Sequence, residues 1–211
     1  MKKILALSAT LALSGTALAG AVYGPGAGAA IPDNAPAGVT SVINVPDSFT
    51  VTDVNVTING LTHTWVGDIV ATLTKGAVTR TFVSRIGRTS PTTGAGDSSD
   101  FNGSYTFDSD SANSIFAAAA AVGGAVAVAP GTYFTSDSAT AGTAPNQAGN
   151  VNNLAFNAFD GLDAAGDWTL TISDNAAADT GSFSGWTIEI APEPTSLSLL
   201  GLAGLALIRR R

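Results

Sequence analysis

The alternation of apolar and polar residues is clearest between residues 157 and 190. Around Trp168, apolar residues alternate with Thr and Ser in the segment WTLTISD, which is the two-residue period of a half-buried strand. The same period returns around Trp186 in the segment GWTIEI. Residues 174–182, which join the two segments, contain the Asp, Asn and Gly of a connecting loop. The pattern predicts two antiparallel strands that pair with each other and bury both Trp side chains in a β core.

Strand patterns also appear earlier in the chain, over residues 39–45, 49–58 and 61–87. Asn59-Gly60 predicts a turn after the second of these stretches, and Lys75-Gly76 predicts a hairpin turn within the third. The alanine-rich stretch 115–129 fits a short helix, a strand or a surface loop equally well. The body of the chain is therefore expected to be all-β.

The two ends of the chain differ from this body. Residues 1–19 contain a Lys pair, an apolar run and the sequence Ala-Leu-Ala, which is the organisation of a secretory signal peptide. Residues 20–38 are rich in Gly, Ala and Pro, and they predict a flexible leader without a packed role. We expect a single β domain over residues 39–191, followed by a separate tail over residues 192–211.

Composition narrows the class of protein. The chain has 211 residues, 45% of them hydrophobic and 12% charged, which suits one folded domain with short tails. It has no cysteine, so disulfides cannot hold the fold together. Between residues 20 and 191, fifteen acidic residues face four basic ones, which gives a net charge near −11. This charge argues against nucleic acid and anionic lipid as partners.

Four motifs lie between residues 39 and 190. They are H-T-W-x-G-D-[IL]-V-x-x-L at residues 63–73, YTFDSDS at 105–111, PGTYFTS at 130–136, and G-x-W-T-L-x-I-x-D followed by D-x-G-x-[FL]-x-x-W-x-[IL]-x-[IL] at 166–190. In this order they resemble the P domain, or P/Homo B domain, which follows the catalytic domain of kexin- and furin-like proprotein convertases and of many bacterial secreted proteases. The resemblance implies a galactose-binding-like, jelly-roll β-sandwich that stabilises and regulates a protease.

The tail carries a second resemblance. Pro192, Glu193 and Pro194 precede an apolar run of fourteen residues and then Arg209, Arg210 and Arg211. The prolines should end the last strand. As a helix the run would span about 21 Å, which is short for a permanent anchor, and the arginines favour the cytoplasmic side.

The tail resembles the PEP-CTERM sorting signal of Gram-negative bacteria. This resemblance implies Sec export, transient anchoring in the inner membrane, processing by an exosortase, and delivery to the cell surface or to an exopolysaccharide matrix. The alternative is a buried C-terminal helix, for which neither the proline pair nor the arginines would have a purpose.

A catalytic apparatus is not expected. His63 is the sole histidine, so any Ser-His-Asp arrangement would have to use it as the base. Its place at the entrance of a predicted strand favours a structural hydrogen-bonding role. The sequence Gly181-Ser182-Phe183-Ser184-Gly185 lacks the strand-to-helix context of a nucleophile elbow. We therefore expect a protein that is not an enzyme.

Asp-rich loops predict calcium in place of zinc, because the chain has one His and no Cys while calcium binds six to eight oxygen atoms. A structural calcium is also common in galactose-binding-like sandwiches, which the P-domain resemblance implies. The predicted calcium ligands are Asp68, Asp108, Asp110, Asp174 and Asp179. The alternative is that these side chains cap turns and remain solvated.

Three functions remain open at this point. The leading hypothesis is a secreted structural or adhesive protein of the cell surface or extracellular matrix. The second is an accessory module for a separate subtilisin-like serine protease. The third is a calcium-dependent carbohydrate-binding module, with Tyr105, Tyr133, Trp65 and Trp168 as candidates for stacking on sugars, although the Trp residues fit the core better.

Overall fold

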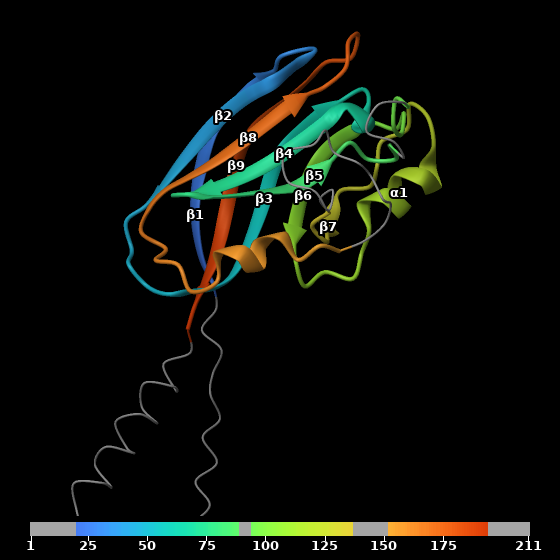
Figure 1. The fold of residues 1–211 in the computed structure, drawn as a ribbon. Coiled ribbons are helices and arrows are strands. Elements are labelled where there is room, and N and C mark those ends of the chain that lie inside the picture. Colours follow the sequence, from blue (N-terminus) through green and yellow to red (C-terminus); the bar gives the residue numbers. More distant parts are fainter. Residues whose placement is uncertain (1–19, 89–93, 137–151, 194–211) are drawn as a thin grey trace, which may run out of the picture.

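Two β-sheets pack face to face in the computed structural model, which describes residues 20–88, 94–136 and 152–193 (Figure 1). One sheet has the strand order β1-β9-β3-β6-β7, and the other has the order β2-β8-β4-β5. The strands are β1 (Ala21–Ile31), β2 (Ala35–Val45), β3 (Val51–His63), β4 (Ile69–Lys75), β5 (Val78–Ser84), β6 (Phe101–Asp108), β7 (Gly131–Tyr133), β8 (Gly166–Asp174) and β9 (Gly181–Pro192). All neighbouring strands are antiparallel except β6 and β7. The expected all-β sandwich is confirmed.

The core lies between the inward faces of the two sheets. Trp168 on β8 and Trp186 on β9 are both fully buried, as the alternation predicts. Each indole N–H also has a partner: that of Trp168 donates to the carbonyl oxygen of Ala164 at 2.9 Å, and that of Trp186 donates to Ser41 Oγ at 2.9 Å. Buried indoles with satisfied N–H groups fix how the sheets pack.

The prediction that β8 and β9 pair with each other is wrong. β8 pairs with β2 and β4, whereas β9 pairs with β1 and β3 in the other sheet. The chain crosses the sandwich between them, and the two Trp residues point into the core from opposite sheets. Period-2 alternation shows which face of a strand is buried, but it does not show which sheet the strand joins.

The prediction of a flexible leader over residues 20–38 is also wrong. β1 occupies residues 21–31 and pairs with β9 along the edge of the five-stranded sheet, and β2 begins at Ala35. The small residues serve close packing: a β carbon on Gly26 would lie 2.2 Å from Trp186 Nε1, and one on Gly28 would lie 2.4 Å from the Phe183 carbonyl oxygen. A Gly- and Ala-rich composition therefore marks an edge strand here and not a linker.

Asn59-Gly60 does not form the predicted turn. β3 continues through it to His63, Gly60 has a φ of +57°, and the pairing with β6 shifts register between Ile58 and Leu61. This irregularity behaves as a β-bulge, which also favours glycine at positive φ. The hairpin predicted at Lys75-Gly76 is confirmed by the pairing of β4 with β5.

The alanine-rich stretch begins as a helix, α1 (Ile115–Val122), beside β7 (Figure 1). Ser114 caps it, because its Oγ accepts a hydrogen bond from the Ala117 N–H at 3.1 Å. Two short 3₁₀ turns complete the described elements, η1 (Val66–Asp68) and η2 (Ala155–Phe159). Among the described residues, none of the helices has the length and apolar character needed to cross a membrane.

Candidate functional site

The five Asp residues predicted as calcium ligands fall into two groups at opposite ends of β3. Asp68, Asp174 and Asp179 lie near the end of β3, where His63 contacts Asp174 and Thr64 Oγ1 donates to Asp179 Oδ1 at 2.8 Å. Asp108 and Asp110 lie near its start, beside Asp53. Ten residues of extended strand separate Asp53 from His63, which corresponds to about 33 Å. One ion therefore cannot use both groups.

Asp68 lies in a buried network with Arg85. Arg85 Nη2 contacts Asp68 Oδ1 at 3.3 Å, Nη1 donates to the Asn175 carbonyl oxygen at 2.9 Å, and Nε donates to the Gly67 carbonyl oxygen at 2.5 Å. Both charged side chains are almost fully buried. The guanidinium thus ties the β5 end, η1 and the loop after β8 together.

His63 and Asp174 form the second pair at this end of the sandwich. His63 Nε2 lies 3.1 Å from Asp174 Oδ2, and both side chains are fully buried. His63 Nδ1 lies 2.9 Å from the Trp65 carbonyl oxygen. Both ring nitrogens therefore have partners, which fits the predicted hydrogen-bonding role. His63 ends β3, however, and does not stand at the entrance of a strand as predicted.

Burial sets the charge behaviour of this network. It raises the pKa of Asp68 from 3.8 to about 6, with Arg85 opposing that rise and the Asp174 charge adding to it. Burial also lowers the pKa of Arg85, and Arg88 adds to that effect. Arg85 contacts Asp68 and His63 contacts Asp174, so side chains of this chain already occupy both carboxylates.

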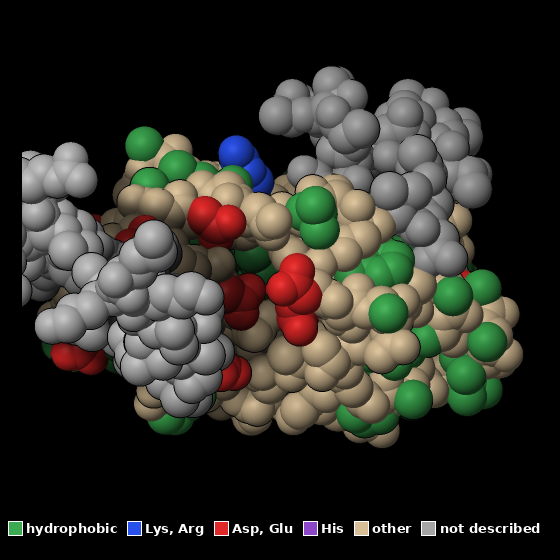
Figure 2. Space-filling model, turned by 90° about the horizontal axis from the view of Figure 1, so that it is seen from below, with side chains coloured by type: hydrophobic (Ala, Val, Ile, Leu, Met, Phe, Trp, Pro, Cys, Tyr) green, Lys and Arg blue, Asp and Glu red, His purple; other side chains and the backbone are tan. Residues whose placement is uncertain are grey.

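Three carboxylates meet at the other end of β3. One oxygen from each of Asp53, Asp108 and Asp110 lies within 4.8 Å of the other two. Asp53 and Asp108 are half-buried, and Asp110 is exposed in the turn after β6. Figure 2 views the molecule from below, at the end where β6 and β9 finish, and Asp and Glu side chains gather on that face. Among the described residues, these three carboxylates form the group that lies close enough together to share a cation.

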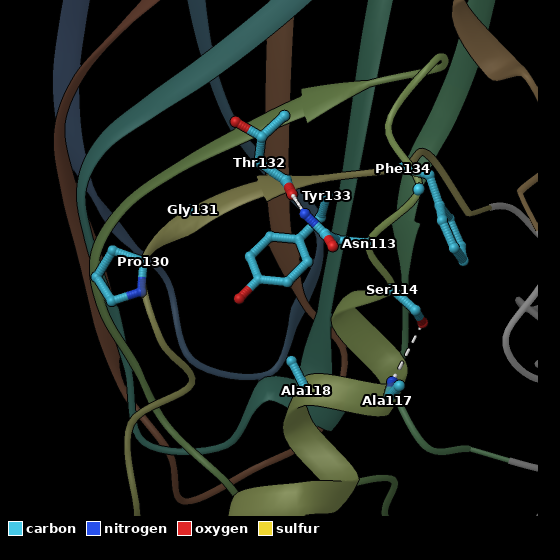
Figure 3. A pocket seen from close by; sticks show the side chains of 10 residues that line it. Asn113, Ser114, Ala117, Ala118, Pro130, Gly131, Thr132, Tyr133 and Phe134 are labelled. Atoms are coloured by element: carbon cyan, nitrogen blue, oxygen red, sulfur yellow. Dashed lines mark hydrogen bonds between the residues drawn. The ribbon is translucent and has the colours of Figure 1, made fainter.

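A cleft of about 630 Å³ lies between β7 and α1 (Figure 3). Its polar side chains are engaged locally: Asn113 Nδ2 donates to the Thr132 carbonyl oxygen at 3.1 Å, and the Tyr133 hydroxyl donates to the Ala129 carbonyl oxygen at 2.6 Å. The Tyr133 ring lies toward Ala118 on α1. The lining has neither a carboxylate nor a histidine, so the cleft offers a contact surface and no acid–base chemistry.

A second hollow, of about 560 Å³, lies around Lys75 at the β4–β5 turn. The Lys75 ammonium lies 5.3 Å from the centre of the Trp168 ring and donates to the Ala165 carbonyl oxygen. Burial lowers the pKa of Lys75, while Asp163 and Asp167 oppose that shift. The ammonium therefore closes one end of the core over the indole.

The aromatic residues considered for sugar stacking are mostly internal. Tyr105 and Trp168 are fully buried, and Tyr133 is 7% exposed. Trp65 is partly exposed, and its indole N–H donates to the Ala95 carbonyl oxygen at 2.8 Å. Of these four residues, Trp65 is the most exposed.

The predicted sorting signal lies largely outside the described residues. β9 ends at Pro192, as expected, and Thr52 Oγ1 donates to the Pro192 carbonyl oxygen at 3.3 Å. The Glu193 N–H donates to the Thr50 carbonyl oxygen at 3.2 Å. Pro194 and the arginines Arg209, Arg210 and Arg211 are outside the described residues, as is the predicted signal peptide over residues 1–19.

Sequence reasoning missed one residue of the acidic group, Asp53. Asp53 lies on the polar face of β3, two residues before Asn55, which is directly opposite Asp108 on β6. The polar positions of residues 49–58 were visible in the alternation, but the register of β3 against β6 was not. Only that register brings Asp53 to Asp108 and Asp110.

One protein-family model matches part of this sandwich. The proprotein convertase P-domain model matches residues 132–190, which include most of β7 and β9 and all of η2 and β8. No curated protein matches the chain.

A search of solved structures finds similarity to two from Aeromonas sobria. The crystal structure of its serine protease shares 13% identity with a TM-score of 0.42, and that of the serine protease in complex with its chaperone shares 14% identity with a TM-score of 0.36. Each similarity covers 82% of this chain and 27% of the other, so this chain spans about a quarter of the length of those proteins. Over residues 132–190 the chain matches the proprotein convertase P-domain model, which confirms the P-domain resemblance for this segment, while the motifs at residues 63–73 and 105–111 lie outside the match.

Proposed function

We propose that this chain is a non-catalytic module of the P-domain type that binds and stabilises a separate subtilisin-like serine protease. The observation that carries the proposal is the family match over residues 132–190, which includes β8 and most of β9. These strands supply Trp168 and Trp186, one to each side of the core. The matched segment is therefore a structural part of the sandwich.

The chemistry of the described residues supports binding over catalysis. His63 is buried with both ring nitrogens occupied, by Asp174 and by the Trp65 backbone. A serine nucleophile needs a general base within hydrogen-bonding reach. The described lining of the cleft between β7 and α1 contains no histidine and no carboxylate, and the hydroxyl of its Tyr133 donates to the Ala129 carbonyl oxygen.

Co-isolation tests the proposal. The full chain, carrying an affinity tag, is recovered from its native host, and the bound fraction is treated with a fluorophosphonate probe that labels active serine hydrolases. We expect a labelled protease to accompany the chain. A matched control carries Trp168→Ala and Trp186→Ala, which remove core contacts from both sheets, and it should lose the labelled band. A folded chain recovered without any labelled protease would contradict the proposal.

The tail supports a second candidate, a structural or adhesive protein of the cell surface or exopolysaccharide matrix. The supporting observation is the sequence from Pro192 to Arg211, with its proline pair, apolar run and terminal arginines. In this case Sec and an exosortase process the chain, and it is recovered with polysaccharide in place of a protease. Mass spectrometry of the isolated chain distinguishes the processed ends, since removal of residues 1–19 and cleavage near Pro192 would both shorten it.

A further inference from the structure

The outer edge of β2 is an open strand edge of the four-stranded sheet. β2 is the first strand in the order β2-β8-β4-β5, and among the described strands it pairs with β8 alone (Figure 1). Its pairing is regular over the stretch from Val39 to Val45, because the register shift lies before Val39. Along this regular stretch, every second residue turns its backbone N–H and C=O away from β8, where they can pair with a further strand.

The registers of the sheet show which residues of β2 face outward. Lys75 and Val78 flank the two-residue turn between β4 and β5, and residues in that position form a hydrogen-bonded pair. The alternation from that pair through β4 and β8 leaves Thr40, Val42 and Asn44 with their backbone groups directed away from β8. Within the described part of the chain, no other residue makes a hydrogen bond to those groups. Their side chains are exposed as well, and that of Val42 is 51% exposed.

The other three sheet edges of the described fold are protected by residues of the chain itself. On β5, Arg80 Nη1 donates to the outward carbonyl oxygen of Thr79 at 2.9 Å. On β7, the Thr132 carbonyl oxygen accepts a hydrogen bond from Asn113 Nδ2 at 3.1 Å. On β1, Pro25 removes an N–H at the point where the register shifts. The regular stretch of β2 has no proline, no bulge and no charged side chain, which are the usual protections of an edge strand.

The distribution of charge indicates which partner fits this edge. With a net charge near −11 between residues 20 and 191, two copies of the chain repel each other over most of their surface. They can meet at the regular stretch of β2 without placing like charges opposite each other, because it contains no Asp, Glu, Lys or Arg. Val42 is the midpoint of that stretch. An antiparallel pairing about a two-fold axis at Val42 therefore overlaps the whole stretch with its counterpart and places Thr40 opposite Asn44 of the second copy.

We propose that β2 pairs with β2 of a second copy of this chain, so that the two four-stranded sheets join into one continuous sheet. About six backbone hydrogen bonds connect Thr40, Val42 and Asn44 across the axis. The exposed Val42 side chain then packs against its counterpart. The contact leaves the cleft between β7 and α1 free, because β7 lies at the opposite edge of the sandwich from β1 and β2. The dimer is thus compatible with a protease partner but does not require one.

Sedimentation equilibrium of the full chain at increasing concentration tests the dimer. We expect the mass to rise from 20.9 kDa toward twice that value. Val42→Lys should raise the dissociation constant at least about tenfold, because two ammonium groups would meet at the axis. Val22→Lys is the matched control, since Val22 is 65% exposed on β1 and the change should leave the dimer intact. A chain that keeps the mass of one copy, or two variants that associate equally, would overturn the proposal.

Two further measurements locate the axis. An equimolar mixture of Val42→Lys and Val42→Glu should restore the dimer, because opposite charges then face each other, and misfolded variants would not be restored in this way. The chain has no cysteine, so oxidation of Val42→Cys should link two copies through one disulfide. Asn44→Cys should stay unlinked, since its counterpart lies about 13 Å away along the strand. Failure of the mixture to associate, or equal linking of the two cysteine variants, would overturn the pairing about Val42.

Discussion

Among the described residues, the most deeply buried ionisable side chains lie near the end of β3. Each of them contacts an ionisable side chain of the opposite type or a backbone carbonyl oxygen. Removing water from an ion costs several kcal/mol, so an ion pair of this kind is stable only when its hydrogen bonds are complete. Arg85 meets that condition with Asp68 and two backbone carbonyl oxygens. The network thus fixes the loops at this end of the sandwich.

Asp68 should make stability depend on pH. Its pKa of about 6 in the folded chain lies above the ordinary 3.8, so between these values the folded state holds a proton that the unfolded state lacks. The contribution of Asp68 to the free energy of unfolding is therefore greatest below pH 4 and falls as the pH rises through 6. We expect the melting temperature of the chain, relative to that of Asp68→Asn, to fall between pH 4.5 and pH 7.

The difference from Asp68→Asn isolates this group, because the other carboxyls titrate in both proteins. Asp47→Asn, which removes an exposed charge, serves as the control and should show no comparable trend. If the difference in melting temperature between the unaltered chain and Asp68→Asn stayed constant across this pH range, Asp68 would have the same pKa in the folded and unfolded states. That result would contradict the prediction.

At the scale of the element, β1 is the strand whose role contrasts most with its composition. It lies against β9 at a sheet edge, and Gly26 approaches the Trp186 indole, whose N–H is held by Ser41. An indole held in this way cannot move aside for a larger side chain. The Gly-rich segment is therefore part of the folded body.

Gly26→Val should destabilise the chain by about 1–3 kcal/mol through overpacking. Ala27→Val is the matched control, since Ala27 is exposed in the same strand and should tolerate the change. Urea unfolding of both variants, followed by Trp fluorescence, measures the two effects. Equal stability of the two variants would mean that residues 21–31 do not pack on β9.

How far the elements could be predicted depends on what information each one carries. Alternation located β8 and β9 and showed that Trp168 and Trp186 are buried, because burial has a two-residue period. It could not assign the two strands to different sheets, since that depends on contacts distant in sequence. The composition of residues 20–38 led to the wrong prediction of a flexible leader for the same reason. Small residues are needed there because the strand packs against Trp186, which is distant in sequence.

The acidic group, too, could be predicted from the sequence only in part. Asp108 and Asp110 are neighbours in sequence and were predicted as ligands. Asp53 joins them only through the pairing of β3 with β6. Asp68 was also predicted as a ligand, but Arg85 contacts it, and that contact depends on the fold of the chain after β5.

At the scale of the whole molecule, the two sheets enclose one core, and the described ends of the chain lie side by side, since Ala21 is opposite Ile190 in the β1–β9 pair. The body carries a net charge near −11, from fifteen acidic and four basic residues between positions 20 and 191. Charge of this sign favours association with a basic surface. A protease partner should accordingly present such a surface.

We propose that this sandwich stabilises a protease and does not act as one. The direct measurement is the half-life of heat inactivation of the co-isolated protease, with and without added full chain, followed by peptide hydrolysis. We predict that the half-life lengthens several-fold with the chain and that the chain alone hydrolyses nothing. An unchanged half-life at saturating chain, or hydrolysis by the chain alone, would contradict the claim.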